Sequence, residues 1–123
     1  IGHLNFPEIQ PIIGAPDVFE YRNKMEYTFS NRGWLTQEQI DSGQEFERRA
    51  LGFHVPGRFD GVMQINKCYL QDDLGNQIRN FVHQYSVEKE FTFYNVKMHE
   101  GFLRNLIMRN NIAGEWMVTI FFG

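Results

Sequence analysis

The sequence contains a single cysteine, Cys68, among its 123 residues, and this scarcity excludes several kinds of site. One cysteine forms neither an internal disulfide nor a metal site of several thiolates. A lone cysteine in a folded chain is most often a small buried hydrophobe, and the residues alone favour that role for Cys68. The absence of a disulfide framework agrees with a cytoplasmic protein.

The chain also lacks an excess of basic residues and any long apolar run. Its formal net charge is −3, whereas a free-standing nucleic-acid binder is usually basic. A local basic patch on an acidic domain remains compatible with this balance. No apolar run approaches the roughly 20 residues that span a bilayer, so we expect no membrane partner.

The constellations that would support catalysis are missing as well. None of the 11 glycines forms a glycine-rich loop of the kind that binds a nucleotide-like cofactor. The histidines do not share the short spacing of metal ligands, and no Ser-His-Asp or paired-carboxylate arrangement follows from spacing. We therefore expect that the chain alone catalyses no reaction.

The residues that are present predict an α+β domain. Alternating apolar and polar positions indicate an antiparallel sheet of about five strands, because the connections between them are mostly short. In the strand that contains Met25, Tyr27 and Phe29, these three side chains share one face. The predicted strands are Met25–Ser30, Phe46–Val55, Val62–Lys67, Phe102–Arg109 and Glu115–Phe122.

One main helix is predicted over Asp73–Tyr85, with Asp72 or Asp73 as its N-cap. Helical spacing places five apolar residues on one face of this helix, and we expect that face to pack on the sheet. They are Leu74, Ile78, Phe81, Val82 and Tyr85. Gln77, Arg79, Asn80 and Gln84 then fall on the polar side. A capping-box pattern at Thr36 and Gln39 indicates a further short helical turn.

Two of the predicted strands have faces of interest. Arg48, Ala50, Gly52 and His54 share one face, which a ligand backbone could approach closely at Gly52. A glycine required for sheet twist explains that position almost as well. In the strand over Phe102–Arg109, alternation groups Phe102, Arg104, Leu106 and Met108 against Leu103, Asn105 and Ile107.

Four spaced motifs resemble the bacterial RNA uracil-5-methyltransferases. They are Tyr21-Arg22-Asn23-Lys24, Leu51-Gly52-Phe53-His54, Ile65-Asn66-Lys67-Cys68-Tyr69-Leu70 and Glu100-Gly101-Phe102-Leu103-Arg104. The resemblance covers essentially the full length and is to the central domain of those enzymes. It implies that residues 1–123 are one domain of a larger enzyme whose N-terminal oligonucleotide-binding barrel and C-terminal methyltransferase domain lie outside this chain.

The resemblance implies a function in which S-adenosylmethionine donates a methyl group to C5 of a uridine. The central domain would bind and scaffold the RNA, with ribosomal RNA favoured over transfer RNA and the other domains of the chain as further partners. The residues we expect to face the RNA are Arg22, Lys24, His54, Arg58 and Arg104, with Phe53 and Phe59 available for stacking. The alternative is a free-standing α+β module that binds a protein partner.

The resemblance also gives Cys68 a second interpretation. In many members of the family the central domain carries a 4Fe–4S cluster, and the Lys67-Cys68 context resembles its fourth ligand. Such a cluster requires four thiolates, so we expect none in this chain. Cys68 would then be a single remaining ligand, with its thiol near the surface and accessible to reagents.

Overall fold

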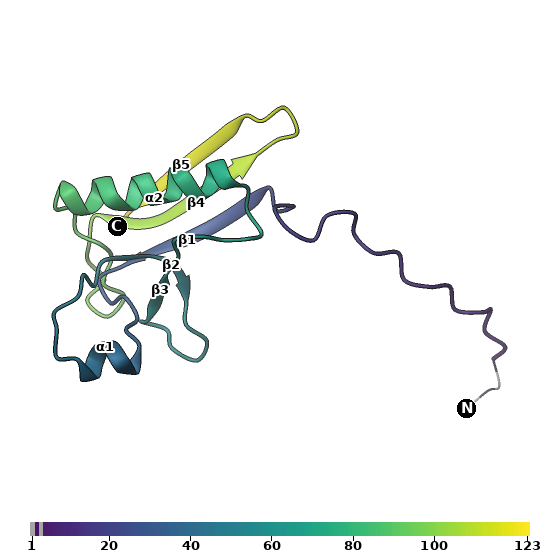
Figure 1. Cartoon of the computed structure of the whole chain (residues 1–123), viewed down its shortest axis with the longest axis horizontal. Helices are drawn as coiled ribbons and strands as arrows, with labels where there is room; N and C mark the ends of the chain where they lie inside the picture. The colour runs from purple at the N-terminus through teal and green to yellow at the C-terminus, as the bar shows by residue number, and fades with distance from the viewer. Residues whose placement is uncertain (1, 3) are drawn as a thin grey trace.

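A computed structural model describes residues 2 and 4–123, and these form a five-stranded antiparallel sheet with one long helix on one face (Figure 1). The strand order is β3-β2-β1-β4-β5, so β1 is central. The elements in chain order are β1 (Lys24–Ser30), α1 (Gln37–Asp41), β2 (Ala50–His54), β3 (Val62–Gln64), α2 (Asp73–Glu88), β4 (Leu103–Asn110) and β5 (Trp116–Phe122). The predicted α+β class is confirmed.

The core lies between the sheet and α2. Met25, Tyr27 and Phe29 of β1 are buried as their alternation predicts, and they meet Leu106 and Met108 of β4. Their partners on the same face also include Leu51, which pairs with Phe29 across β2. The other face of the sheet carries polar and half-buried side chains and is free of a covering helix (Figure 1).

Two predicted strands are shorter in the structure. Residues 46–49 form no strand because β1 ends at Ser30, opposite Ala50, and the Arg48 carbonyl accepts from the Gly33 amide at 2.6 Å instead. β3 ends at Gln64 rather than Lys67, because the Gln64 side chain accepts the Leu51 amide at 2.8 Å. That amide is therefore unavailable to a longer β3.

The close approach at Gly52 is made by the protein's own backbone. A Cβ on Gly52 would collide with the carbonyl oxygen of Met63, its neighbour on β3. The space above this glycine is therefore filled by strand pairing, and no ligand is required to explain it.

The face of α2 that meets the sheet differs from the predicted one. Gly75, Asn76, Arg79 and Ser86 are its buried residues, whereas Leu74, Phe81 and Tyr85 of the predicted core stripe are 45% to 68% exposed. Ile78 and Val82 do pack against the core. The helix is rotated because Gly75 sits against Trp116 of β5, where a Cβ would approach the indole to 2.6 Å.

Both ends of α2 have a clear physical cause. The Asp72 side chain accepts from the Gly75 amide at 3.1 Å, which selects Asp72 as the N-cap. The helix continues one turn past Tyr85 and stops before Glu90, whose φ of 56° is left-handed. The short helix α1 begins at the predicted capping box of Thr36 and Gln39.

A β-bulge in β4 changes which side chains face the core. The register shifts between Leu103 and Asn105, so Arg104 is the extra residue. Leu103 is therefore buried beside Leu106 and Met108, while Arg104 is exposed. The predicted alternation, which grouped Arg104 with Leu106, is wrong for this reason.

The segment before β1 extends away from the body (Figure 1). It carries apolar side chains that are 63% to 97% exposed, among them Phe6, Ile9, Ile12 and Phe19. Its last residues are tied down by backbone bonds from Glu20 to the Tyr69 carbonyl at 2.8 Å and from Arg22 to the Leu70 carbonyl at 2.9 Å. None of the helices among the described residues is long and apolar enough to cross a membrane.

Candidate nucleic-acid interface

The structure separates four of the five predicted RNA-facing residues into two groups, and the fifth, Arg58, lies in the turn between β2 and β3. Arg22 and Lys24 lie at the start of β1, where Lys24 pairs with Arg109 of β4. His54 and Arg104 lie near the other half of β1, next to Thr28. Thr28 is four residue steps along the strand from Lys24, which is about 13 Å.

A hollow on the helix-free face of the sheet collects His54 and Arg104 with Phe59, which was predicted to stack on a base. We call it the sheet depression; it has a volume of about 180 Å³ and is lined by Thr28, Ser30, His54, Phe59, Tyr94 and Arg104, among others. The β4 bulge turns Arg104 toward it, and the guanidinium lies 4.8 Å from the centre of the Tyr94 ring. Phe59 is 67% exposed, with the Lys97 ammonium 5.8 Å from the centre of its ring, so the exposed part of the ring can stack on a planar group.

A second hollow lies next to the first and was not predicted. We call it the Trp34 cleft; it has a volume of about 270 Å³ and is lined by Arg32, Gly33, Trp34, Ile40, Arg48 and Arg58, among others. Arg58 lies 4.8 Å above the Trp34 ring, which is a cation–π distance. The Arg48 Nε donates to the Gly33 carbonyl at 2.9 Å and holds the two loops together.

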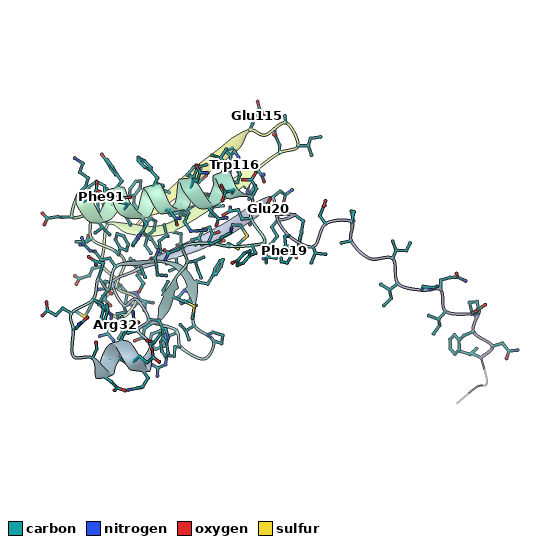
Figure 2. The ribbon with its side chains drawn as sticks, in the orientation of Figure 1. Phe19, Glu20, Arg32, Phe91, Glu115 and Trp116 are labelled. Carbon is teal, nitrogen blue, oxygen red and sulfur yellow. The ribbon has the colours of Figure 1, made fainter. Side chains whose placement is uncertain are left out.

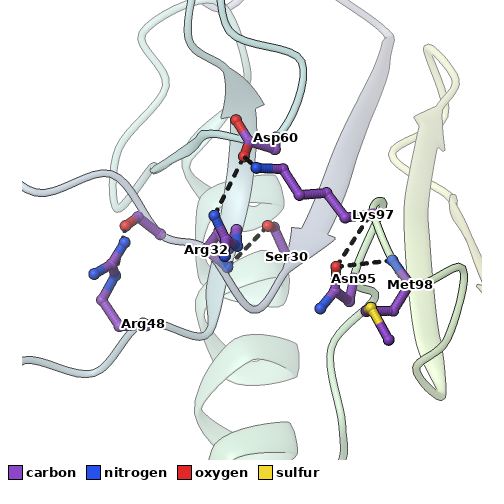
Figure 3. Close-up of polar contacts among 8 residues, drawn as sticks. Ser30, Arg32, Arg48, Asp60, Asn95, Lys97 and Met98 are labelled. Atoms are coloured by element: carbon purple, nitrogen blue, oxygen red, sulfur yellow. Dashed lines mark hydrogen bonds and ion pairs between the residues drawn. The ribbon is translucent and has the colours of Figure 1, made fainter.

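Asp60 joins the two hollows and contributes to the lining of both. Its carboxylate contacts the Lys97 ammonium at 2.8 Å and the Arg32 guanidinium at 3.4 Å (Figure 3). The hydrogen bond from Lys97, with the nearby positive charges, lowers the pKa of Asp60 below its ordinary value. Asp60 is therefore ionised at neutral pH and links three separate loops.

The lining of the two hollows is strongly cationic although the chain as a whole is acidic. It includes Arg32, Arg48, Arg58 and Arg104 and a single carboxylate, that of Asp60. Figure 2 shows Arg32 at the end of the body opposite Glu115. These four arginines form a local basic patch of the kind that binds phosphate.

Several members of this cluster do not stand out in the sequence. Arg32 and Trp34 lie between the predicted strands, and Arg48 falls in the first four residues of the predicted strand Phe46–Val55, which form no strand. Arg48 reaches Gly33 across a sequence separation of 15 residues, which no local pattern reports. The adjacency of arginine and tryptophan around Gly33 is the one local signal that could have indicated a binding loop.

Phe53 is not available for stacking on a ligand, so that prediction is wrong. Its ring stacks on Tyr27 with centroids 5.0 Å apart and packs against the core cluster. Phe53 follows Leu51 by two residues on β2, and period-two alternation sends both side chains to the helix side of the sheet.

Cys68 lies in the core, and the predicted surface position of its thiol is wrong. The residue is 8% exposed and belongs to the buried cluster around Tyr27. The Asn76 side chain fixes its backbone, since Asn76 Oδ1 accepts from the Cys68 amide at 2.7 Å and Nδ2 donates to its carbonyl at 3.0 Å.

The residues around Cys68 do not fit an iron–sulfur cluster within this chain. A 4Fe–4S cluster takes four thiolates, and Cys68 is the one cysteine of the sequence. Among the described residues, no three His, Cys, Asp or Glu side chains converge in a way that could hold a metal ion. The role of Cys68 as one ligand of a larger set stays a prediction.

Sequence relatives of the chain share one description. No protein-family model matches the chain. Proteins named uncharacterized RNA methyltransferase are similar to it in Bacteroides thetaiotaomicron, 47% identical over 98% of this chain, and in Chlorobaculum tepidum, 40% identical over 97%. A third, from Porphyromonas gingivalis, is 37% identical over 99% of this chain. The resemblance to RNA methyltransferases is therefore confirmed.

The match covers only part of each relative. The chain spans 25% to 28% of the length of these three proteins. Among solved structures, a Pyrococcus abyssi tRNA (uracil-54, C5)-methyltransferase in complex with S-adenosyl-L-homocysteine matches with a TM-score of 0.62. It is 19% identical, over 87% of this chain and 23% of its own, so it supports the fold alone.

Proposed function

We propose that this chain is an RNA-binding and scaffolding segment of an S-adenosylmethionine-dependent RNA uracil-5-methyltransferase. The observation that carries the proposal is the pair of cationic hollows, whose linings combine arginines with the aromatic rings of Trp34, Phe59 and Tyr94. Arginine neutralises phosphates, and aromatic rings stack on unpaired bases. RNA methyltransferase relatives make RNA the matching ligand.

The sheet depression is the proposed primary contact. His54 and Arg104 would meet the backbone of the RNA, while Phe59 and Tyr94 would stack on bases next to the target uridine. Enzymes that act on a base turn it out of its stack, so the flanking nucleotides require a rigid support. Arg22 and Lys24, on the strand end nearer Arg109, would contact phosphates farther along the strand.

In this proposal the methyl transfer takes place outside the chain. The nucleophile, the base and the S-adenosylmethionine site would belong to the remaining three quarters of a protein as long as the relatives. Ribosomal RNA in the cytoplasm is the proposed substrate, with transfer RNA as the alternative. Cys68 would contribute to a cluster only with ligands from outside this chain.

A salt titration tests the proposal. The chain is titrated into fluorescein-labelled, uridine-rich single-stranded RNA, and anisotropy gives the affinity at several salt concentrations. Arg58→Gln with Arg104→Gln is expected to reduce the slope of log affinity against log salt by about 0.7 for each phosphate that the variant no longer neutralises. The charge control is Lys89→Gln at the end of α2, which should leave the slope unchanged. Absence of wild-type binding at low salt would refute the proposal.

One observation favours a second candidate, a protein-binding module. Aromatic rings form a continuous band along the outside of α2 and on to β5, with centroids 4.7 to 6.3 Å apart in the order Phe81, Tyr85, Phe91, Phe102 and Phe122. All except Phe91 are 45% or more exposed. Exposed apolar bands of this kind mark protein contacts. A chain that binds no RNA, but binds a protein partner in a way that Phe81→Ser abolishes and Arg104→Gln leaves unchanged, would favour this candidate.

A further inference from the structure

The Trp34 cleft has the features of a ligand site in its own right. Its walls come from the loop after β1, from α1 and from the turn between β2 and β3. The Trp34 cleft shares only the turn between β2 and β3, through Asp60, with the sheet depression. A shallow hollow lined by His54, Arg58 and Phe59 connects the two, so the three form one track along this end of the molecule.

The cleft offers more hydrogen-bond donors than the protein uses. A guanidinium has five N–H donors. Within the described part of the chain, the Arg48 side chain donates only through Nε, and the Arg58 side chain makes no hydrogen bond. The carboxylate in the cleft, that of Asp60, is already bound by Lys97 and Arg32. The free donors of Arg48 and Arg58 are therefore suited to an anion.

The cleft also offers a planar apolar wall. Trp34 and Leu35 are half-buried and Ile40 is 57% exposed, so indole and aliphatic surface face the opening. The Arg58 guanidinium over the indole adds a second flat surface on which a ring can stack. A ligand that satisfies both features carries a planar ring and a negative charge a short distance away.

The cleft is held in shape before any ligand binds. The Gly33 amide donates to the Arg48 carbonyl at 2.6 Å, and the Arg48 side chain returns a bond to the Gly33 carbonyl at 2.9 Å. A Cβ on Gly33 would lie 2.8 Å from the same Arg48 oxygen, so glycine is what permits this contact. Arg48 is thus placed at the cleft by two bonds and loses little freedom on binding.

We propose that the Trp34 cleft binds a second unpaired nucleotide of the same RNA strand, with its base against the stacked Trp34 ring and Arg58 guanidinium and its phosphate on Arg48. The proposal rests on the proposed function, since the strand reaches the cleft from the sheet depression. It adds a defined second subsite, so that the chain reads an extended strand and not one isolated nucleotide. Base stacking makes this subsite tolerant of sequence.

Oligonucleotides of graded length test this subsite. Affinity should rise as a uridine-rich single strand is lengthened until it spans both hollows, and then level off. Trp34→Ala should remove the rise, with about a tenfold loss for the long strands and none for the shortest, since one stacked base contributes roughly that much. Arg48→Gln should weaken the long strands alone. Its matched control is Arg49→Gln, because Arg49 pairs with Glu47 at 2.8 Å and does not line the cleft.

A spectroscopic signal provides an independent check on the same subsite. The chain has two tryptophans, Trp34 and Trp116, so Trp116→Phe leaves Trp34 as the reporter. Long strands should quench its fluorescence, whereas the shortest strands and inorganic phosphate should not.

The two proposals fail in distinguishable ways. Wild-type protein that binds no RNA of any length would overturn the proposed function and the subsite together. Wild-type binding that involves Arg104, with no effect of Trp34→Ala or Arg48→Gln and no quenching, would overturn the subsite alone. Circular dichroism of each variant distinguishes weaker RNA binding by a folded protein from a failure to fold, and Arg48→Gln keeps the test valid if Trp34→Ala does not fold.

Discussion

Arg79 is the largest fully buried side chain of the protein, with no exposed surface. Among the described residues, no carboxylate lies within ion-pair distance of it. Its guanidinium donates to Tyr27 Oη at 3.1 Å and to Asn76 Oδ1 at 2.8 Å, and its Nε has no partner within the described residues. A cation buried on neutral acceptors alone is costly.

The neighbours of Arg79 retain hydrogen bonds of their own. Tyr27 Oη donates to Gln71 Oε1 at 2.7 Å, and Asn76 Oδ1 accepts from the Cys68 amide. Burial raises the pKa of Tyr27 above its ordinary value although Arg79 opposes this, so the hydroxyl stays neutral and remains a donor. The cluster therefore holds together without the positive charge.

This arrangement predicts different outcomes for two substitutions of Arg79. Arg79→Met fills the same volume without a charge, and we expect a free energy of unfolding within about 1 kcal/mol of the wild type, or higher. Arg79→Ala leaves a cavity and should lower it by about 2 to 4 kcal/mol. Urea unfolding followed by circular dichroism measures both. Equal losses in the two variants would show that the charge itself is required.

At the scale of the elements, the sequence predicts strands better than it predicts their faces. Alternation predicts all five strands and the central position of Met25, Tyr27 and Phe29 in the core. In a strand with one buried face every second side chain points to the core, so apolar residues recur at every second position. It fails at Arg104, since a bulge inserts one residue and inverts the alternation beyond it.

The helix shows the complementary limit. Apolar spacing predicts its position, yet Arg79 of its polar side is buried and Phe81 of its apolar stripe is 68% exposed. The rotation is set by Gly75 against Trp116, a contact between residues far apart in the sequence. The candidate site is likewise only half predictable, because Arg48 and Trp34 meet Arg58 through loops and not through a local pattern.

Gly52 gives a test of the β2–β3 pairing. Gly52→Ala would place a methyl group on the Met63 carbonyl, so we expect the free energy of unfolding to fall by about 3 kcal/mol or more. RNA binding should fall with it, because the turn after β2 carries Arg58 and Asp60.

The matched control for Gly52→Ala is Gly61→Ala, in the turn between β2 and β3. The nearest atoms to a Cβ on Gly61 are 3.7 Å away, so Gly61→Ala should change stability by less than about 1 kcal/mol. Thermal unfolding compares the two variants. A Gly52→Ala protein as stable as the control would show that β3 pairs weakly with β2.

At the scale of the whole molecule, charge and apolar surface are segregated. The basic hollows lie around the loops beside β1, β2 and α1, and the aromatic band lies along the outside of α2. The extended segment that leaves from Glu20 is apolar as well (Figure 1). A net charge of −3 thus conceals a surface with distinct regions for anions and for apolar partners.

The free edge of β5 has a consequence for solubility. β5 is the last strand of the sheet, and its sequence from Trp116 to Phe122 contains no charged residue and no proline. Edges without such protection act as templates for further strands. In concentrated solution we therefore expect the chain to associate reversibly through this edge, seen as a sedimentation coefficient that rises with concentration.

A charge in the middle of that edge should suppress the association. Thr119→Lys is expected to keep the chain monomeric, whereas Gln84→Lys on the exposed side of α2 should not. Association unchanged by Thr119→Lys would locate the contact elsewhere. Association through this edge would limit the protein concentration at which RNA titrations with the wild-type chain report on the monomer. The Thr119→Lys variant would allow titrations at higher concentration.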